Sequence, residues 1–141
     1  MSDFSMFMAG KAEECESVKY VASKRFKNKG KAVPWEIKPI SSDLDEAIRK
    51  ECTKRVPIPG KRGQFNQETD TDKYIAKLCV ACTVFPNLND AELQDSYGVK
   101  TPDALLKKLL LPGEYTEYKA KVMEVNGYDM SMEELVDEAK N

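Results

Sequence analysis

The chain has 141 residues, of which 41% are hydrophobic and 33% are charged. This length suits one domain, and the composition is too apolar for a disordered chain. With 22 Lys and Arg against 24 Asp and Glu, the net charge of -2 argues against the strong positive field of a general nucleic-acid binder. No apolar run approaches the roughly 20 residues of a membrane helix, and the first residues lack the pattern of a secretory signal. We therefore expect a single domain over residues 1–141, located in the cytoplasm, with its cysteines reduced.

Two alternating runs near the N-terminus predict a β-hairpin. The sequence SVKYVASKRF alternates apolar with polar residues, as does AVPWEIKPI, and the turn-prone KNKGK lies between them. Pro34 and Pro39 have no amide hydrogen to donate to a neighbouring strand. We therefore expect the second strand of this hairpin to lie at the edge of its sheet.

From Ser41 onward the apolar residues recur at helical spacing. A first helix is expected behind Ser42 and Asp43 and should end near Arg55. The segment VPIPGKRGQFNQETDTD is rich in Pro, Gly and polar residues, which predicts a long loop. A second helix should begin near Asp70 and end at the sequence FPN.

Capping patterns and glycines divide the remainder of the chain into further helices. The residues that mark their starts and stops are Asn89 with Glu92, Gly98, Thr101 with Pro102, Glu114, Asn126 with Gly127, and Ser131 with Glu134. Strands followed by a series of helices predict an α+β fold. We expect a β-rich part over residues 17–40, containing an antiparallel hairpin or small sheet, and about five α-helices over residues 42–141.

Cys79 and Cys82 form a CxxC pair, which raises the question of metal or redox chemistry. A reactive pair normally lies at a helix N-terminus, whereas these cysteines fall inside a predicted helix on the same face as Leu78. A zinc site would need Cys15 and Cys52 as further ligands, because the chain has no histidine. We predict that the pair packs in the core, and a metal or thiol site is the alternative.

Residues 19–31 carry six Lys and Arg residues and no acid, with Tyr20 and Phe26 among them. A solvated hairpin tip explains this run, and binding to nucleic acid or to an acidic protein is the alternative. After Leu111 the bias is reversed, since acidic residues outnumber lysines. Pairing of these oppositely charged parts between copies of the chain is therefore an alternative to plain solvation.

Catalysis finds little support in the sequence. The absence of histidine excludes imidazole acid–base chemistry, and neither GxxxxGK[ST] nor GxGxxG is present to hold a phosphate. We therefore expect a protein that is not an enzyme, with no catalytic residue, no cofactor and no metal.

Two long segments, residues 69–99 and 105–141, carry a family resemblance. The motifs LPGEY, NGYD and SMEELVDEAKN occur in the second segment in this order, and ASKRFKNKGKAVPWEIKPIS extends the similarity toward the N-terminus. In this combination the chain resembles the XkdN-like tail assembly chaperones. These are small proteins of long-tailed phages, prophages and defective phage elements of Gram-positive bacteria.

This resemblance implies a function. A member of the family would bind the tape measure protein, a long helical chain that sets tail length, and keep it soluble until tube subunits polymerise around it. The chaperone would then leave and be absent from the mature virion. Relatives commonly have a longer, frameshifted form, and this chain resembles the shorter product. The implied partners in the host bacterial cytoplasm are therefore the tape measure protein and, in addition, the longer form, the tail tube protein and further copies of the chain.

A chaperone that holds an apolar chain needs adaptable apolar side chains, and methionine is soft and flexible. The residues that we predict to contact the partner are Phe4, Met6, Phe7 and Met8, with Tyr115 and Tyr118 as a second group. The alternative for all six is a place in the core.

Overall fold

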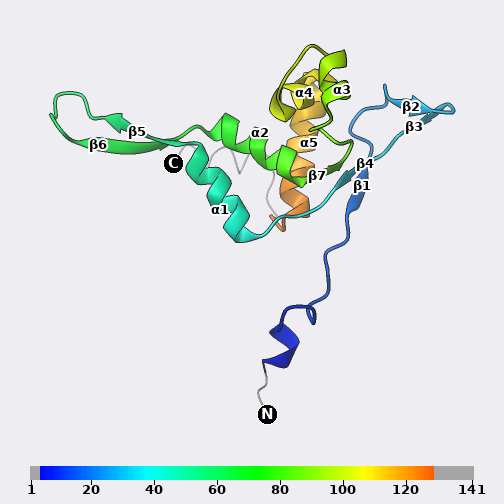
Figure 1. The fold of residues 1–141 in the computed structure, drawn as a ribbon, viewed down its shortest axis with the longest axis horizontal. Coiled ribbons are helices and arrows are strands. Elements are labelled where there is room, and N and C mark those ends of the chain that lie inside the picture. Colours follow the sequence, from blue (N-terminus) through cyan, green and yellow to red (C-terminus); the bar gives the residue numbers. More distant parts are fainter. Residues whose placement is uncertain (1–3, 129–141) are drawn as a thin grey trace.

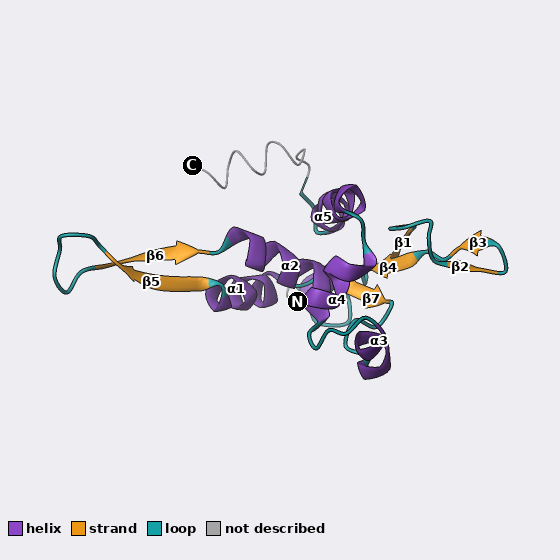
Figure 2. Cartoon of the chain, turned by 90° about the horizontal axis from the view of Figure 1, so that it is seen from above, coloured by secondary structure: helices purple, strands orange, loops and turns teal. Residues whose placement is uncertain are grey.

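The computed structural model describes residues 4–128 of the chain. Two β-hairpins extend in opposite directions from a body of helices and a small sheet, and the N-terminal segment leaves this body by itself (Figures 1 and 2). The helices are α1 (Ser42–Glu51), α2 (Thr71–Cys82), α3 (Ala91–Ser96), α4 (Pro102–Leu109) and α5 (Pro112–Val125). The strands are β1 (Val18–Tyr20), β2 (Lys27–Asn28), β3 (Lys31–Ala32), β4 (Trp35–Ile37), β5 (Thr53–Pro57), β6 (Phe65–Thr69) and β7 (Thr83–Phe85). The predicted α+β class is confirmed, and the helix expected at Ser131 lies outside the described residues.

The three-stranded sheet has the antiparallel order β1-β4-β7. β4 is therefore its central strand, and the prediction that this strand lies at an edge is wrong. Pro34 and Pro39 fall just outside Trp35–Ile37, so neither has to donate a hydrogen bond to a neighbouring strand. The third strand, β7, follows α2 without a connecting loop, in a stretch that we expected to be helical.

The segment expected to be a long loop forms a second hairpin, β5–β6. Its register runs from Thr53 opposite Thr69 to Pro57 opposite Phe65, and α1 consequently ends at Glu51 instead of near Arg55. The strands are almost entirely exposed and mostly polar, so they lack the alternation that reveals a half-buried strand. Three of the seven strands within residues 4–128 thus lie in the part of the chain that we expected to be helical.

Local capping explains where α2, α3 and α4 begin and where α5 ends. Thr101 and Asp70 accept backbone hydrogen bonds at the starts of α4 and α2, as predicted. At α3 the cap is Asp90, whose Oδ1 accepts from the Leu93 amide at 2.8 Å, so the predicted cap Asn89 is one residue too early. Gly127, with φ of 92°, ends α5 in the left-handed conformation that glycine adopts most easily.

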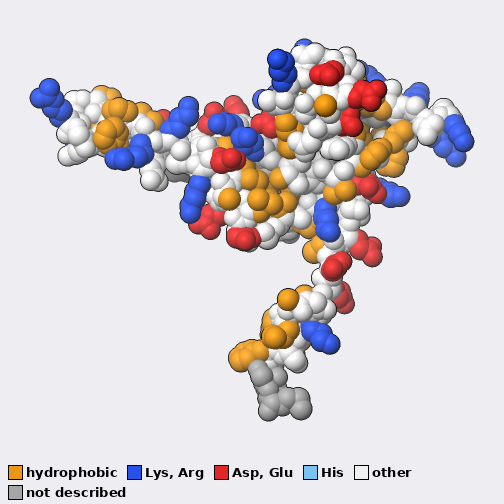
Figure 3. Space-filling view, in the orientation of Figure 1, with side chains coloured by type: hydrophobic (Ala, Val, Ile, Leu, Met, Phe, Trp, Pro, Cys, Tyr) orange, Lys and Arg blue, Asp and Glu red, His pale blue; other side chains and the backbone are white. Residues whose placement is uncertain are grey.

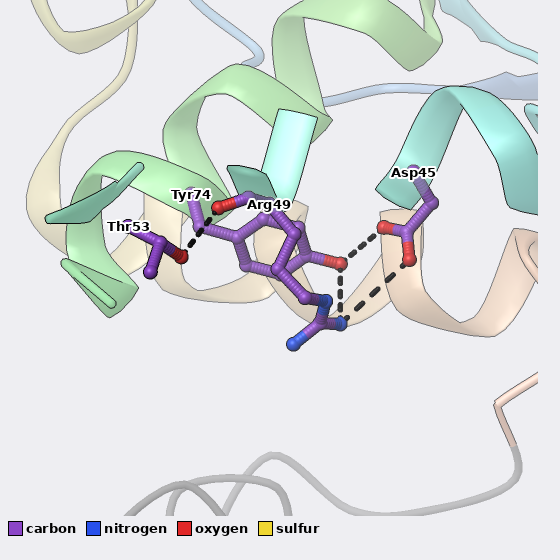
Figure 4. A network of polar contacts seen from close by, with 4 residues as sticks. All are labelled: Asp45, Arg49, Thr53 and Tyr74. Atoms are coloured by element: carbon purple, nitrogen blue, oxygen red, sulfur yellow. Dashed lines mark hydrogen bonds and ion pairs between the residues drawn. The ribbon is translucent and has the colours of Figure 1, made fainter. Parts of the chain in front are cut away.

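α1 and α2 are held together by a polar network (Figure 4). The Tyr74 hydroxyl on α2 donates to the carboxylate of Asp45 on α1, and Arg49 donates to the same hydroxyl at 3.0 Å. The Arg49 guanidinium also lies 4.3 Å from the centre of the Tyr74 ring. Burial and the neighbouring carboxylate raise the pKa of Tyr74, so its hydroxyl stays protonated and remains a donor. This network fixes α1 on α2.

The main core lies where α2, α4 and α5 cover the three-stranded sheet (Figure 1). Tyr118 is fully buried there, with its ring centre 5.1 Å from that of Trp35 and 6.1 Å from that of Tyr20. Its hydroxyl is 2.6 Å from the Thr83 hydroxyl on β7. Tyr118 is therefore a core residue in this structure, and we no longer propose it as a contact for a partner.

Candidate partner-binding surfaces

Residues 4–17 form an N-terminal arm in which every residue is exposed. It contains one short turn of 3-10 helix, Ser5–Phe7, and otherwise leads away from β1 without joining the body (Figure 1). The predicted contact residues are highly exposed, at 70% for Phe4, 64% for Met6, 76% for Phe7 and 62% for Met8. Their hydrophobic side chains gather near the end of the arm (Figure 3). A cluster of exposed large apolar side chains is typical of an interaction site.

Tyr115, from the second predicted group, lies on the body of the protein. It is in the first turns of α5, partly buried against the core, and the Lys119 ammonium lies 4.6 Å from its ring centre. Burial raises the pKa of its hydroxyl to about 12. The structure therefore does not bring Tyr115 together with the arm.

A second apolar surface, which the sequence analysis missed, is a groove of about 410 Å³ at the base of the β2–β3 hairpin. We call it the hairpin-base groove. Its apolar lining residues are Phe26, Val33, Trp35, Phe85, Pro86, Leu93, Tyr97 and Leu109. They come from the two ends of the β2–β3 hairpin, from β4 and β7, and from α3, α4 and the residues next to them, so no single stretch of sequence reveals the groove. Phe85 and Tyr97 remain 47% and 37% exposed.

Arg25 joins the basic hairpin to the helical part of the protein. Its guanidinium donates to the Leu109 carbonyl at 2.6 Å, at the end of α4, and lies 5.3 Å from the centre of the Phe26 ring. A cation is favourable at this end of a helix because the carbonyl dipoles point toward it. Arg25 therefore has a structural task, whereas Lys27 and Lys29 are exposed with the other lysines of the hairpin.

The CxxC cysteines pack in the core, as predicted. Cys79 and Cys82 are fully buried, and burial raises the pKa of Cys79 to about 12 and also raises that of Cys82. Cys52 is buried as well, whereas Cys15 is exposed on the arm. In residues 4–128 no three His, Cys, Asp or Glu side chains are placed to hold a metal ion.

We expect native thiol labelling to separate these cysteines. Cys15 should react with an alkylating probe in the folded protein, while Cys52, Cys79 and Cys82 should react only after unfolding, because a buried neutral thiol is a poor nucleophile. Mass spectrometry of labelled peptides measures this directly. Rapid native labelling of Cys79 or Cys82 would restore the thiol-chemistry alternative.

Stability should fall as the pH rises above 9. The usual pKa of a cysteine is 9.0, but that of Cys79 is raised to about 12 in the folded protein. Between these values the unfolded chain loses a proton that the folded chain keeps, so higher pH favours unfolding. Urea unfolding between pH 9 and pH 12 should show this decline, and Cys79→Ala should make it shallower. An equal slope in the variant would show that Cys79 does not contribute.

Comparison with known proteins identifies the family. A family model described as phage XkdN-like tail assembly chaperone protein matches residues 4–140. The chain belongs to the XkdN-like family of phage tail assembly chaperones. The chaperone is 33% identical to the phage-like element PBSX protein XkdN of Bacillus subtilis, with the alignment covering 99% of this chain and 94% of that protein.

A second relative provides an experimental structure. The uncharacterized protein YqbN of Bacillus subtilis is 36% identical over 99% of the chaperone and 93% of its own length. The crystal structure of YqbN superimposes with a TM-score of 0.78 at 32% identity, covering 92% of the chaperone and 99% of that chain. YqbN thus shares the fold of the chaperone as well as its sequence. The partners of a tail assembly chaperone are phage tail proteins. No helix within residues 4–128 is long and apolar enough to cross a membrane.

Proposed function

We propose that this chaperone binds the tape measure protein in the host cytoplasm and keeps it soluble until tube subunits polymerise around it. After polymerisation the chaperone leaves, so it is absent from the mature virion. Membership of the tail assembly chaperone family supports this function, and the observation that carries it is the exposed apolar cluster on the N-terminal arm. The proposed task is binding alone and involves no catalysis.

The arm has the chemistry that such a task requires. Covering one Phe or Met side chain completely is worth about 1.5–3 kcal/mol, so a few contacts suffice for a reversible complex. Met6 and Met8 have flexible thioether side chains that adapt to different apolar partners along a long helical chain. The charged surface of the body would keep the complex in solution (Figure 3). The exposed part of Tyr115 is a secondary contact in this proposal.

Co-expression with the tape measure protein of the same phage element tests the function. We expect the chaperone to increase the soluble fraction of the tape measure protein and to co-elute with it. A variant in which Phe4, Met6, Phe7 and Met8 are all replaced by serine should lose both effects. The matched control is Leu44→Ser with Leu111→Ser, because these leucines are 45% and 51% exposed on the body.

Two outcomes would contradict the proposal. Full co-elution of the arm variant would place the contact elsewhere on the protein. Failure of the wild-type chain, and also of a longer frameshifted form, to solubilise the tape measure protein would reject the function.

A second candidate function rests on the exposed lysines of the β2–β3 hairpin, which would bind nucleic acid or an acidic protein. Such binding should weaken steeply with salt and should disappear when Lys24, Lys27 and Lys29 are changed to alanine. Arg25 is left unchanged in this test because it holds the end of α4. Binding that is absent or independent of salt would remove this alternative.

A further inference from the structure

The arm and the hairpin-base groove lie on the same chain without touching. The arm leaves the body and carries exposed apolar side chains near its end (Figures 1 and 3), and the groove is an apolar depression in the body. We propose that, in the free chaperone, the arm of one copy docks in the hairpin-base groove of a second copy. This contact goes beyond the proposed function and does not depend on it.

The apolar parts of the two surfaces match in chemistry. Phe85 and Tyr97 line the groove while keeping part of their side chains in solvent. A volume of about 410 Å³ is within the range of sites that enclose an apolar ligand. Met6 and Phe7 on the arm offer one flexible and one rigid apolar side chain to fill such a site.

The charges that flank these apolar parts are opposite. Immediately after its apolar end the arm becomes acidic, with Glu13, Glu14 and Glu16 and only one lysine. The β2–β3 hairpin, which rises from the groove, is basic and has no acidic residue. Five residues, 8–12, separate Phe7 from Glu13, and they form a turn in which the Lys11 amide donates to the Met8 carbonyl at 2.9 Å. Even if it were fully extended, this link would span at most roughly 20 Å, so the acidic stretch of a docked arm would lie along this hairpin.

A second part of the groove lining determines the direction in which the arm docks. This part is α3, which contributes Leu93 to the lining and also carries Glu92 and Asp95. An acidic stretch along α3 would meet like charges, whereas along the hairpin it meets Lys27 and its neighbours. Charge therefore favours one orientation of the arm over the reverse.

The course of the chain favours a second copy over the chain's own groove. The arm leaves β1 at Val18, whereas the groove lies beyond the opposite end of this strand, where the chain continues from Tyr20 to Phe26. In Figure 1 the arm points away from the β2–β3 hairpin. To reach its own groove the arm would have to reverse within residues 11–17, which contain neither Gly nor Pro. A head-to-tail contact of this kind builds rings or open chains.

Sedimentation of the full chain without the tape measure protein tests the contact. Wild-type protein should self-associate, and both the arm variant Met6→Ser with Phe7→Ser and the groove variant Phe85→Ser should raise the dissociation constant at least about tenfold. The control is Val84→Ser, because Val84 is 51% exposed, precedes Phe85 on β7 and does not line the groove. Adjacent strand residues point to opposite faces, so this control should associate like the wild type.

Mixing the two variants distinguishes docking between copies from docking within one. The arm variant keeps its groove and the groove variant keeps its arm, so the mixture should form a 1:1 heterodimer. Each variant by itself should stay monomeric. A chain that carries the arm and groove substitutions together should stay monomeric. Thermal unfolding checks that Phe85→Ser is folded, and Tyr97→Ser serves as the groove variant if it is not.

Three results would overturn the inference. One is a wild-type chain that stays monomeric, and this includes a chain whose arm docks in its own groove. Another is self-association that survives both variants, and the last is the absence of the heterodimer. Since the tape measure protein is absent from these measurements, a negative result leaves the proposed function standing. Conversely, the tape measure protein would compete for the arm, and failure to solubilise it would leave this contact intact.

Discussion

Replacing Tyr118 by alanine should lower the free energy of unfolding by about 3–5 kcal/mol. The side chain extends from α5 and is fully buried against the sheet, where its ring meets those of Trp35 and Tyr20. Alanine would leave a cavity that the surrounding side chains cannot fill without moving. Urea denaturation followed by circular dichroism measures this loss.

The matched control is Tyr118→Phe, which keeps the ring and removes only the hydroxyl. We expect it to cost about 0.5–1.5 kcal/mol, the usual net value of one hydrogen bond. The Thr83 hydroxyl is not orphaned, since it still donates to the Cys79 carbonyl at 2.6 Å. If Tyr118→Ala instead left stability unchanged and abolished tape measure binding, Tyr118 would be a contact residue after all.

Replacing Asn126 by leucine should cost about 1–3 kcal/mol. Asn126 follows α5, and its side-chain oxygen accepts a hydrogen bond from the Ile40 amide at 3.1 Å. Its side-chain nitrogen donates to the Val122 carbonyl at 2.8 Å and lies 3.3 Å from the Cys82 sulfur. Leucine would leave the Ile40 amide without its acceptor in a partly buried place.

Hydrogen exchange gives a specific measurement for this variant. The Ile40 amide should exchange faster in Asn126→Leu, whereas Asn126→Asp keeps an acceptor oxygen and should retain more of the protection. An unchanged exchange rate in the leucine variant would show that the Asn126 side chain does not hold the segment between β4 and α1 in place.

Features that depend on neighbouring residues could be predicted from the sequence. A helix cap such as Thr101 and a stop such as Gly127 act within one turn, so their signals are complete in a short stretch of chain. The burial of Cys79 and Cys82 follows from their position on the apolar side of one helix. The family resemblance is likewise carried by contiguous motifs and is confirmed by the match over residues 4–140.

Features that depend on distant contacts were predicted less well. The polar strands of the β5–β6 hairpin have no buried face, so no apolar periodicity marks them as strands. Tyr118 was predicted as a secondary partner contact with the core as the alternative, and its surroundings, Trp35 and Thr83, come from remote parts of the chain. A tyrosine is compatible with either place, and only its neighbours decide between them.

The fold and the candidate surfaces can both be divided into features that the sequence determined and features that only the tertiary structure decided. The sequence by itself determined the starts of α2 and α4, the family, and the grouping of Phe4, Met6, Phe7 and Met8 in one short apolar stretch. Only the tertiary structure decided that β4 is central, that Tyr118 is core, and that a groove exists at the base of the β2–β3 hairpin. The physical reason is that strand order and concave surfaces arise from contacts between segments far apart in the chain, which no local pattern contains.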